Sequence, residues 1–224
     1  MALITGAGRG IGRATALALA RRDVHCLLLD RTPGSPEATE QAIRQETGRT
    51  ATILPFDLTD REAMLRIGPS IGQRFGRLDL LVHAAAPFMP LAPLTHLRDA
   101  DHDRAVAGRL TATMALLRAC TPLLQAAASP AAVILTNGFL AEQAPWRSLT
   151  APSEAAVQAL VHVWEQEQAE YGLRVVLHDP GPCATRLRAQ YFPAETQALQ
   201  ADLTSPDEAA DIIAGLCLGP ASAV

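Results

Sequence analysis

Several features that would place a protein in a common functional class are absent from this chain of 224 residues. No apolar stretch reaches the roughly 18 residues that a membrane-spanning helix requires, and no two cysteines have the Cys-x-x-Cys spacing of a zinc or thioredoxin-like site. The 19 basic residues are all arginine and are scattered along the chain. Without a basic stripe, nucleic acid is not an expected partner. We therefore expect a cytoplasmic protein with no metal site, whose four cysteines serve as small buried hydrophobic residues.

What the chain does contain is enough apolar sequence for one large core. Hydrophobic residues make up 49% of it, and we expect a single domain over residues 1–224. Strands are expected at residues 2–4, 24–29, 50–55, 78–83, 131–136 and 173–178, and helices at 13–22, 37–47, 60–75, 99–127, 152–171 and 205–218. This alternation predicts an α/β fold with a doubly wound parallel sheet of about six strands, which binds ligands beyond the carboxyl ends of its strands.

The first predicted strand runs into a glycine loop, TGAGRGIG at residues 5–12. Glycines let a backbone approach a pyrophosphate, and the free N–H groups at a helix N-terminus favour the anion. The second strand is followed by Asp30, which lies 18 residues after Gly12. A carboxylate there is placed to accept hydrogen bonds from ribose hydroxyls and would repel a 2′-phosphate. The pattern predicts a site for NAD rather than NADP, with an ordinary tight turn as the alternative.

In their order along the chain, these motifs resemble the short-chain dehydrogenase/reductase family. The loop fits TGxxxGIG, residues 57–58 resemble a dipeptide that holds adenine, residues 78–82 match the strand before an NNAG tetrapeptide, and residues 180–185 fit a PGxxxT motif that seats the nicotinamide. The resemblance implies a Rossmann-like fold, although the family's usual seventh strand has no counterpart after residues 205–218. It implies these cofactor-binding residues: Gly6, Arg9, Gly10, Ile11, Gly12, Asp30, Asp57, Leu58, Ala84, Pro180, Gly181 and Thr185.

The resemblance fails at the residues that carry the family's chemistry. Family members use an asparagine that holds a relay water, a serine that orients the substrate, a tyrosine that is the general acid or base, and a lysine that lowers the tyrosine pKa. Aligning SEAAV at residues 153–157 with the family's SKAAV places Glu154 at the lysine and Thr150 at the tyrosine. Asn137 then stands at the serine and Arg109 at the asparagine, and the NNAG tetrapeptide reads HAAA at residues 83–86.

These replacements change the expected chemistry. An aliphatic hydroxyl at Thr150 is a far weaker acid than a phenol, and a carboxylate at Glu154 disfavours the phenolate or alkoxide that a dehydrogenase must stabilise. The two tyrosines lie elsewhere, Tyr171 at the far end of the helix and Tyr191 beyond the PGxxxT motif. We expect Arg109 and Glu154 to form a partly buried ion pair in place of the proton relay. The alternative is that both side chains point to solvent.

Other residues could host a different chemistry, and each has a simpler interpretation. His83 could be an acid or base, but a packed histidine is favoured. The neighbours His178 and Asp179 could orient an imidazole, but a turn contact is favoured because strand neighbours point to opposite faces. Cys183 is expected to be an inert thiol, since no cation stands beside it.

The leading functional interpretation is a redox-silent family member that keeps the fold, has an NAD site and plays a regulatory or accessory role. An active NAD-dependent oxidoreductase of a carbonyl or alcohol substrate, with non-standard proton donors, is the alternative. A lyase or hydrolase that uses His83 or His178 is the third. The resemblance also implies a homodimer or homotetramer formed through the helices at 99–127 and 152–171. The sequence does not specify the substrate.

Overall fold

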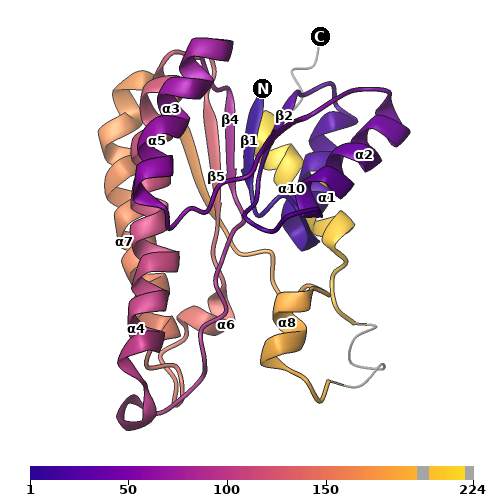
Figure 1. The fold of residues 1–224 in the computed structure, drawn as a ribbon. Helices are drawn as coiled ribbons and strands as arrows, with labels where there is room; N and C mark the ends of the chain where they lie inside the picture. The colour runs from indigo at the N-terminus through magenta and orange to yellow at the C-terminus, as the bar shows by residue number, and fades with distance from the viewer. Residues whose placement is uncertain (196–201, 220–224) are drawn as a thin grey trace.

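The computed structural model describes residues 1–195 and 202–219, and these form a parallel sheet between two layers of helices (Figure 1). The strands are β1 (Ala2–Thr5), β2 (Cys26–Leu29), β3 (Thr52–Leu54), β4 (Leu80–His83), β5 (Ala131–Leu135) and β6 (Arg174–His178). Their order is β3-β2-β1-β4-β5-β6, and every neighbouring pair is parallel. This confirms the predicted doubly wound sheet. The strand order reverses between β1 and β4, and folds of this kind bind ligands at that point.

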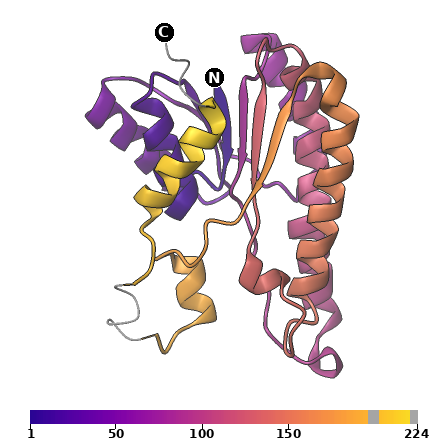
Figure 2. The ribbon, with the colours of Figure 1, turned by 180° about the vertical axis from the view of Figure 1, so that it is seen from behind.

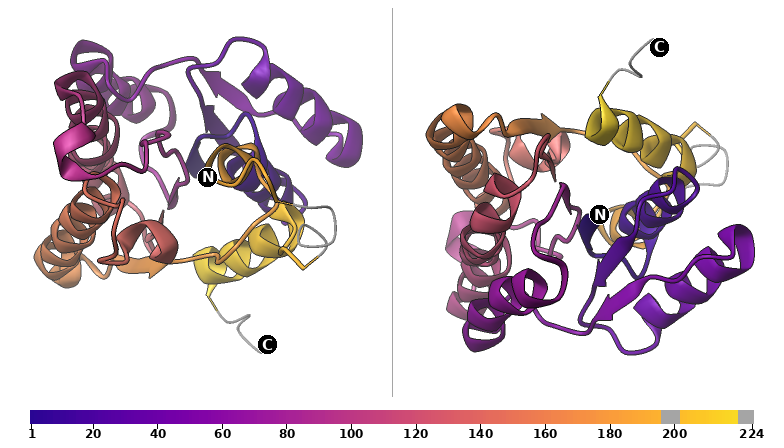
Figure 3. Two further views of the ribbon diagram at one scale, coloured as in Figure 1. Left: turned by 90° about the horizontal axis from the view of Figure 1, so that it is seen from below. Right: turned by 90° about the horizontal axis from the view of Figure 1, so that it is seen from above.

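The helices cover both faces of the sheet (Figures 1 and 2). One layer contains α1 (Gly10–Ala20), α2 (Ser35–Thr47) and α10 (Pro206–Leu218). The opposite layer contains α3 (Arg61–Phe75), α4 (Asp99–Ala105), α5 (Ala112–Gln125) and α7 (Thr150–Gln168). Short helices α6 (Gly138–Ala141) and α8 (Arg186–Tyr191) lie beyond the carboxyl ends of the strands, and single 3₁₀ turns occur at Leu94–His96 and Ala169–Tyr171. Views along the sheet show the two layers on either side of it (Figure 3).

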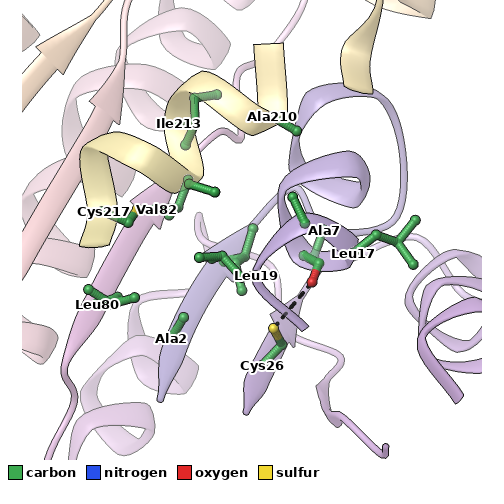
Figure 4. Packing of buried hydrophobic residues seen from close by; sticks show 14 of the residues in the cluster. Ala2, Ala7, Leu17, Leu19, Cys26, Leu80, Val82, Ala210, Ile213 and Cys217 are labelled. Atoms are coloured by element: carbon green, nitrogen blue, oxygen red, sulfur yellow. Dashed lines mark hydrogen bonds between the residues drawn. The ribbon is translucent and has the colours of Figure 1, made fainter. Parts of the chain in front are cut away.

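Apolar residues fill the space on each side of the central strands. Along β1, Ala2 and Ile4 face α1 and α10, whereas Leu3 faces the opposite layer. Because helices cover both faces, the central strands are unbroken apolar runs. Cys26 of β2 donates its thiol hydrogen to the carbonyl of Ala16 in this packing (Figure 4). All four cysteines are buried, as the sequence predicted, and burial raises the pKa of Cys26 to about 12.

The structure corrects several predicted boundaries. The helix predicted at 13–22 already begins at Gly10, because the end of the glycine loop enters its first turn. The strand predicted at 50–55 is shorter, since β3 is an edge strand that pairs only with β2. A π-helical turn at Val106–Thr111 interrupts the long helix predicted at 99–127. A seventh strand is absent from the described residues, and residues 220–224 lie outside them. Within the described part of the chain, no helix is both long and apolar enough to cross a membrane.

Candidate functional site

A cleft of about 380 Å³ lies over the glycine loop and the carboxyl ends of the first strands. Ten of the twelve residues predicted to bind a cofactor line it: Gly6, Arg9, Gly10, Ile11, Gly12, Asp30, Asp57, Leu58, Ala84 and Thr185. The other two, Pro180 and Gly181, line an adjoining cavity. The structure therefore brings the predicted residues to one place, at the point where the strand order reverses.

The glycine loop is shaped so that its backbone comes close to the cleft, between the side chains of Arg9 and Ile11. A Cβ on Gly12 would lie 2.2 Å from the carbonyl oxygen of Gly6, so no larger residue fits there without a shift of the backbone. Gly10 has a φ of 53°, in the left-handed region that favours glycine. No side chain caps the start of α1, and its first turn has no acidic residue. Its N–H groups and positive dipole end are therefore suited to an anion such as a pyrophosphate.

Asp30 forms part of the cleft wall at the end of β2 and is 8% exposed. Its Oδ2 accepts the backbone N–H of Gly8 at 3.0 Å, and its Oδ1 accepts that of Thr32 at 2.9 Å. A carboxylate oxygen has two lone pairs, so each oxygen can still accept a hydroxyl of a ligand. The loop therefore holds this carboxylate in a fixed orientation toward the cleft.

Opposite charges meet at Asp57, farther along the same wall. Arg31 Nη1 lies 3.2 Å from its carboxylate, which also accepts hydrogen bonds from the backbone and hydroxyl of Thr59. Burial alone would raise the pKa of Asp57, but these hydrogen bonds outweigh it and lower the pKa. The cleft thus carries both an arginine and carboxylates near the expected adenosine position.

A second cavity of about 250 Å³ continues from the cleft toward α7 and α8. The two share a wall formed by Ile11, residues 84–87, Thr185 and Leu187. The rest of the cavity is largely apolar, with four polar side chains of interest. Its lining includes Met89, Phe139, Leu140 and Phe192, together with Arg109, Asn137, Glu154 and Tyr191. Cleft and cavity therefore form one continuous trough.

Arg109 and Glu154 form a bidentate ion pair at one side of this cavity. Arg109 Nε donates to Glu154 Oε1 at 2.8 Å, and Nη2 donates to Oε2 at 2.8 Å and to the carbonyl of Leu135 at 2.9 Å. Each side chain is 2% exposed. The predicted ion pair is thus confirmed and is more deeply buried than expected, so the solvent-facing alternative is wrong. Arg109 projects from the π-helical turn at Val106–Thr111, a distortion that is frequent at functional sites.

The other two residues that the sequence alignment placed at the family's tetrad, Asn137 and Thr150, differ in their environment. Asn137 lines the cavity, and its Oδ1 accepts the backbone N–H of Leu140 at 3.1 Å, which caps α6. Thr150 is fully buried at the start of α7, and its hydroxyl has no hydrogen-bond partner within the described part of the chain. It is not part of the cavity wall. The sequence has no lysine that could act from another position.

His83 lies at the centre of a buried hydrogen-bonded chain. Its Nδ1 lies 2.8 Å from the hydroxyl of Thr5, and its Nε2 lies 3.0 Å from that of Thr113. Thr113 donates its own hydrogen to the carbonyl of Arg109, so Nε2 must be the donor to Thr113. The hydroxyl of Thr5 accepts the N–H of Ala85 and donates to Nδ1. Burial and then Arg109 lower the pKa of His83 to about 3, so it is a neutral packed histidine, as favoured.

The remaining candidates also follow their simpler interpretations. Asp179 accepts the backbone N–H of Gly181 at 2.9 Å and that of Gly138 at 2.8 Å, so it stabilises turns. Its partner in the proposed pair, His178, has an Nε2 that is buried with no bonding partner in residues 1–195 and 202–219. Burial and then Asp179 raise the pKa of Cys183, which agrees with an inert thiol.

The sequence alone assigned no role to Tyr191, which α8 brings into the cavity. Its hydroxyl accepts the backbone N–H of Met89 at 3.0 Å, and its ring packs against Phe88 with 4.8 Å between centroids. Burial and, to a smaller extent, Glu154 raise its pKa against the opposing effect of the Met89 hydrogen bond. Two aromatic residues at 191–192, next to the PGxxxT motif, were the only available signal.

Comparisons with known proteins all indicate similarity to short-chain dehydrogenases. The family model for short chain dehydrogenase matches residues 1–214. A short-chain dehydrogenase/reductase of a Cladobotryum species is 30% identical over 96% of this chain and 88% of its own length. The cis-4-hydroxycyclohexanecarboxylate dehydrogenase of Sinomonas cyclohexanicum is 31% identical over 100% and 91%. A short chain dehydrogenase from Shigella flexneri, solved in complex with NADP, is 26% identical with a TM-score of 0.90 over 96% of this chain and 90% of that one.

Proposed function

Because the chain belongs to the short-chain dehydrogenase family, we propose that it binds a nicotinamide dinucleotide and is an oxidoreductase of a carbonyl or alcohol compound, with proton donors other than the family's tetrad. The observation that carries this proposal is the continuous trough. A phosphate-binding loop lies at one end, and an apolar cavity with a few polar groups lies at the other. A bound nicotinamide supplies or takes up a hydride, and the protein orients the reacting groups.

The residues of the cleft fit such a cofactor. The N–H groups at the start of α1 suit the pyrophosphate, and Asp30 suits the ribose hydroxyls. Thr185, Pro180 and Gly181 border the junction of cleft and cavity, where the nicotinamide would lie. These assignments rest on the lining of the trough and on the order of the family motifs.

We propose NAD rather than NADP as the preferred cofactor. The fixed carboxylate of Asp30 favours free ribose hydroxyls and repels a phosphate. The nearby guanidinium of Arg31 is engaged with Asp57, which reduces its attraction for a phosphate. The relative from Shigella flexneri is complexed with NADP, so separate titrations with both cofactors are required.

Titration with NADH and NADPH, followed by fluorescence, tests the binding site. Arg9 and Arg13 both have exposed side chains near the start of α1, but only Arg9 lines the cleft. We expect Arg9→Ala to weaken NADH binding about 5-fold, or about 1 kcal/mol, and the matched control Arg13→Ala to leave it unchanged. Absence of binding by the wild-type protein would refute the proposed cofactor site. Turnover of a carbonyl and alcohol panel then tests the oxidoreductase activity.

A redox-silent protein is the second candidate function. Two observations favour it: Glu154 is held by Arg109, and Thr150 does not reach the cavity. If it is right, activity requires restoration of the family's residues through Thr150→Tyr, Glu154→Lys and Asn137→Ser, with Arg109→Asn to avoid two facing cations. Turnover by the unmodified protein would exclude this candidate.

We also propose that two copies of the chain associate through α5 and α7. The outer faces of these helices expose apolar residues, with Met114 44% and Val163 55% exposed. Sedimentation of Val163→Glu tests this, because a charge there should dissociate the oligomer. Ile212, which is 55% exposed on α10 across the sheet, provides the control Ile212→Glu. The cytoplasmic location stays a prediction from the sequence.

A further inference from the structure

Arg109 has one nitrogen that the ion pair does not use. Nε and Nη2 make three hydrogen bonds to Glu154 and Leu135, whereas Nη1 has no acceptor among residues 1–195 and 202–219. The guanidinium lines the cavity and is rigid, because two carboxylate oxygens and a carbonyl fix its plane. Its Nη1 hydrogens are therefore available to a ligand, with no further loss of side-chain freedom.

Tyr191 brings a second donor to the same cavity from a different element. Its hydroxyl oxygen accepts the Met89 N–H at 3.0 Å, which orients the hydroxyl. Its own hydrogen has no acceptor in the described part of the chain. Because burial and Glu154 raise its pKa, the phenol stays protonated, and so a donor, at neutral pH.

Among the described residues, the cations that line the cavity are paired with carboxylates. Glu154 neutralises Arg109, and Glu195 lies 2.6 Å from the guanidinium of Arg188. The remaining carboxylate, Asp179, is directed at the backbone N–H groups of Gly138 and Gly181. The other walls are largely apolar. With both arginines paired and Asp179 negative, these charges favour a neutral ligand over a carboxylate.

We propose that Arg109 Nη1 and the Tyr191 hydroxyl together hold the single oxygen of a neutral, otherwise apolar carbonyl or alcohol ligand. This rests on the proposed function and names the substrate class of that site. Two donors fixed in an apolar cavity lose hydrogen bonds when a ligand without oxygen fills it, which disfavours that ligand. The same donors would stabilise negative charge that develops on the oxygen.

Binding of matched small molecules tests the proposal without relying on turnover. Cyclohexanone, methylcyclohexane and cyclohexanecarboxylate serve as neutral oxygen-bearing, oxygen-free and anionic probes, each measured by calorimetry with and without NAD. We expect cyclohexanone to bind at least 10-fold more tightly than either other probe. Tyr191→Phe keeps the ring but removes the hydroxyl, and it should weaken the binding of cyclohexanone about 5- to 10-fold without changing the binding of the other two probes. The matched control Tyr171→Phe, at the only other tyrosine in the sequence, should leave the affinity for all three probes unchanged.

The titration of the phenol gives a second readout that a merely structural tyrosine would not change. In Tyr171→Phe, Tyr191 is the only tyrosine, and its ionisation can be followed by ultraviolet absorbance. Donation to a bound ketone favours the neutral phenol, so saturating cyclohexanone should raise its pKa and methylcyclohexane should not. This measurement needs no change at position 191 and is decisive even if Tyr191→Phe is unstable.

Arg109 is tested with its partner, because removing it alone leaves a buried carboxylate. Arg109→Met combined with Glu154→Leu should reduce the preference for cyclohexanone over methylcyclohexane, because only the Tyr191 hydroxyl then remains as a donor, while the cavity still binds both. Equal binding of cyclohexanone to wild type and Tyr191→Phe, or tighter binding of the carboxylate, overturns the proposal. If NADH binds but cyclohexanone shows no preference, only this inference fails. If cyclohexanone is preferred but NADH does not bind, the proposed function fails instead.

Discussion

The two halves of the trough differ in how they are built. The cleft over the glycine loop consists mainly of backbone: glycines that approach one another closely and the free N–H groups at the start of α1. The cavity beside it depends on side chains, and the sequence alignment predicts that each residue of the family's tetrad is replaced there. A bidentate Arg109–Glu154 pair lies at one side of this cavity. A backbone site persists as long as the glycines do, whereas a side-chain site can change chemistry through a few substitutions.

The hydroxyl of Tyr191, rather than that of Thr150, is the candidate for contact with a substrate. Tyr191 reaches the cavity from α8, while Thr150, which the sequence alignment placed at the family's tyrosine, is buried in the helix packing. The polar side chains of the cavity therefore come from several elements, among them α7, α8 and the π-helical turn at Val106–Thr111.

The largest expected effect concerns the ion pair that distinguishes the cavity from the cleft. Glu154→Leu leaves the Arg109 cation buried without a partner, and we expect a loss of about 3 to 5 kcal/mol in the free energy of unfolding. Arg109→Met together with Glu154→Leu removes both charges and should recover most of that loss. Urea unfolding of the two variants and the wild type measures both effects. A double variant less stable than the single one would contradict this account of the pair.

The next prediction concerns the pH dependence of stability that a buried, neutral His83 should cause. Its pKa is about 3 in the folded protein, against 6.5 for the free group. Between these values the unfolded state binds more protons, so stability should fall as the pH falls from 6.5 toward 3, by up to about 1.4 kcal/mol per pH unit. Unfolding of wild type and His83→Asn at several pH values isolates this contribution. Equal slopes for the two proteins would mean that His83 is not held neutral.

A smaller effect should separate a glycine that shapes the cleft from one that does not. Gly12→Ala places a Cβ 2.2 Å from a backbone oxygen and should cost about 1 to 3 kcal/mol, with loss of NADH binding. Gly215, in α10, has open space within 4 Å of the point that a Cβ would occupy. Gly215→Ala should instead stabilise the protein by about 0.5 to 1 kcal/mol and leave binding intact. Denaturation and NADH titration report both outcomes, and tight NADH binding by Gly12→Ala would show that the loop is not the phosphate site.

Sequence patterns predicted the backbone half of the molecule well. The sheet, the main helices and the glycine loop follow from apolar periodicity and from turn residues, which are local signals. The capping box at the start of α10 is also local, since Ser205 and Glu208 satisfy each other's backbone N–H groups. The errors lay at helix and strand ends, at the π-helical turn Val106–Thr111, and at the short helices α6 and α8, which were not predicted.

The side-chain half was predicted only where segments of the sequence could be aligned with the family's motifs. That alignment placed Arg109 opposite Glu154, and the structure shows the pair. It could not find Tyr191, because no spacing along the chain relates α8 to α7, and tertiary packing alone decides which residues of α8 face the cavity. The chain of hydrogen bonds through His83 depends likewise on the meeting of β1, β4 and α5.

The smallest expected effect decides whether Thr150 has inherited any part of the tyrosine's role. Its hydroxyl is buried without a hydrogen bond in the described residues, and the same is true of Thr15 in α1. Valine has the same shape without the hydroxyl, so Thr150→Val and Thr15→Val should each stabilise the protein by about 1 kcal/mol. Thermal unfolding measures this, and any turnover of Thr150→Val should equal that of the wild type. If Thr150→Val instead lowers both stability and turnover, the Thr150 hydroxyl has a partner at the reacting centre. The cavity would then use a group at the position that the sequence alignment assigned to the family's tyrosine.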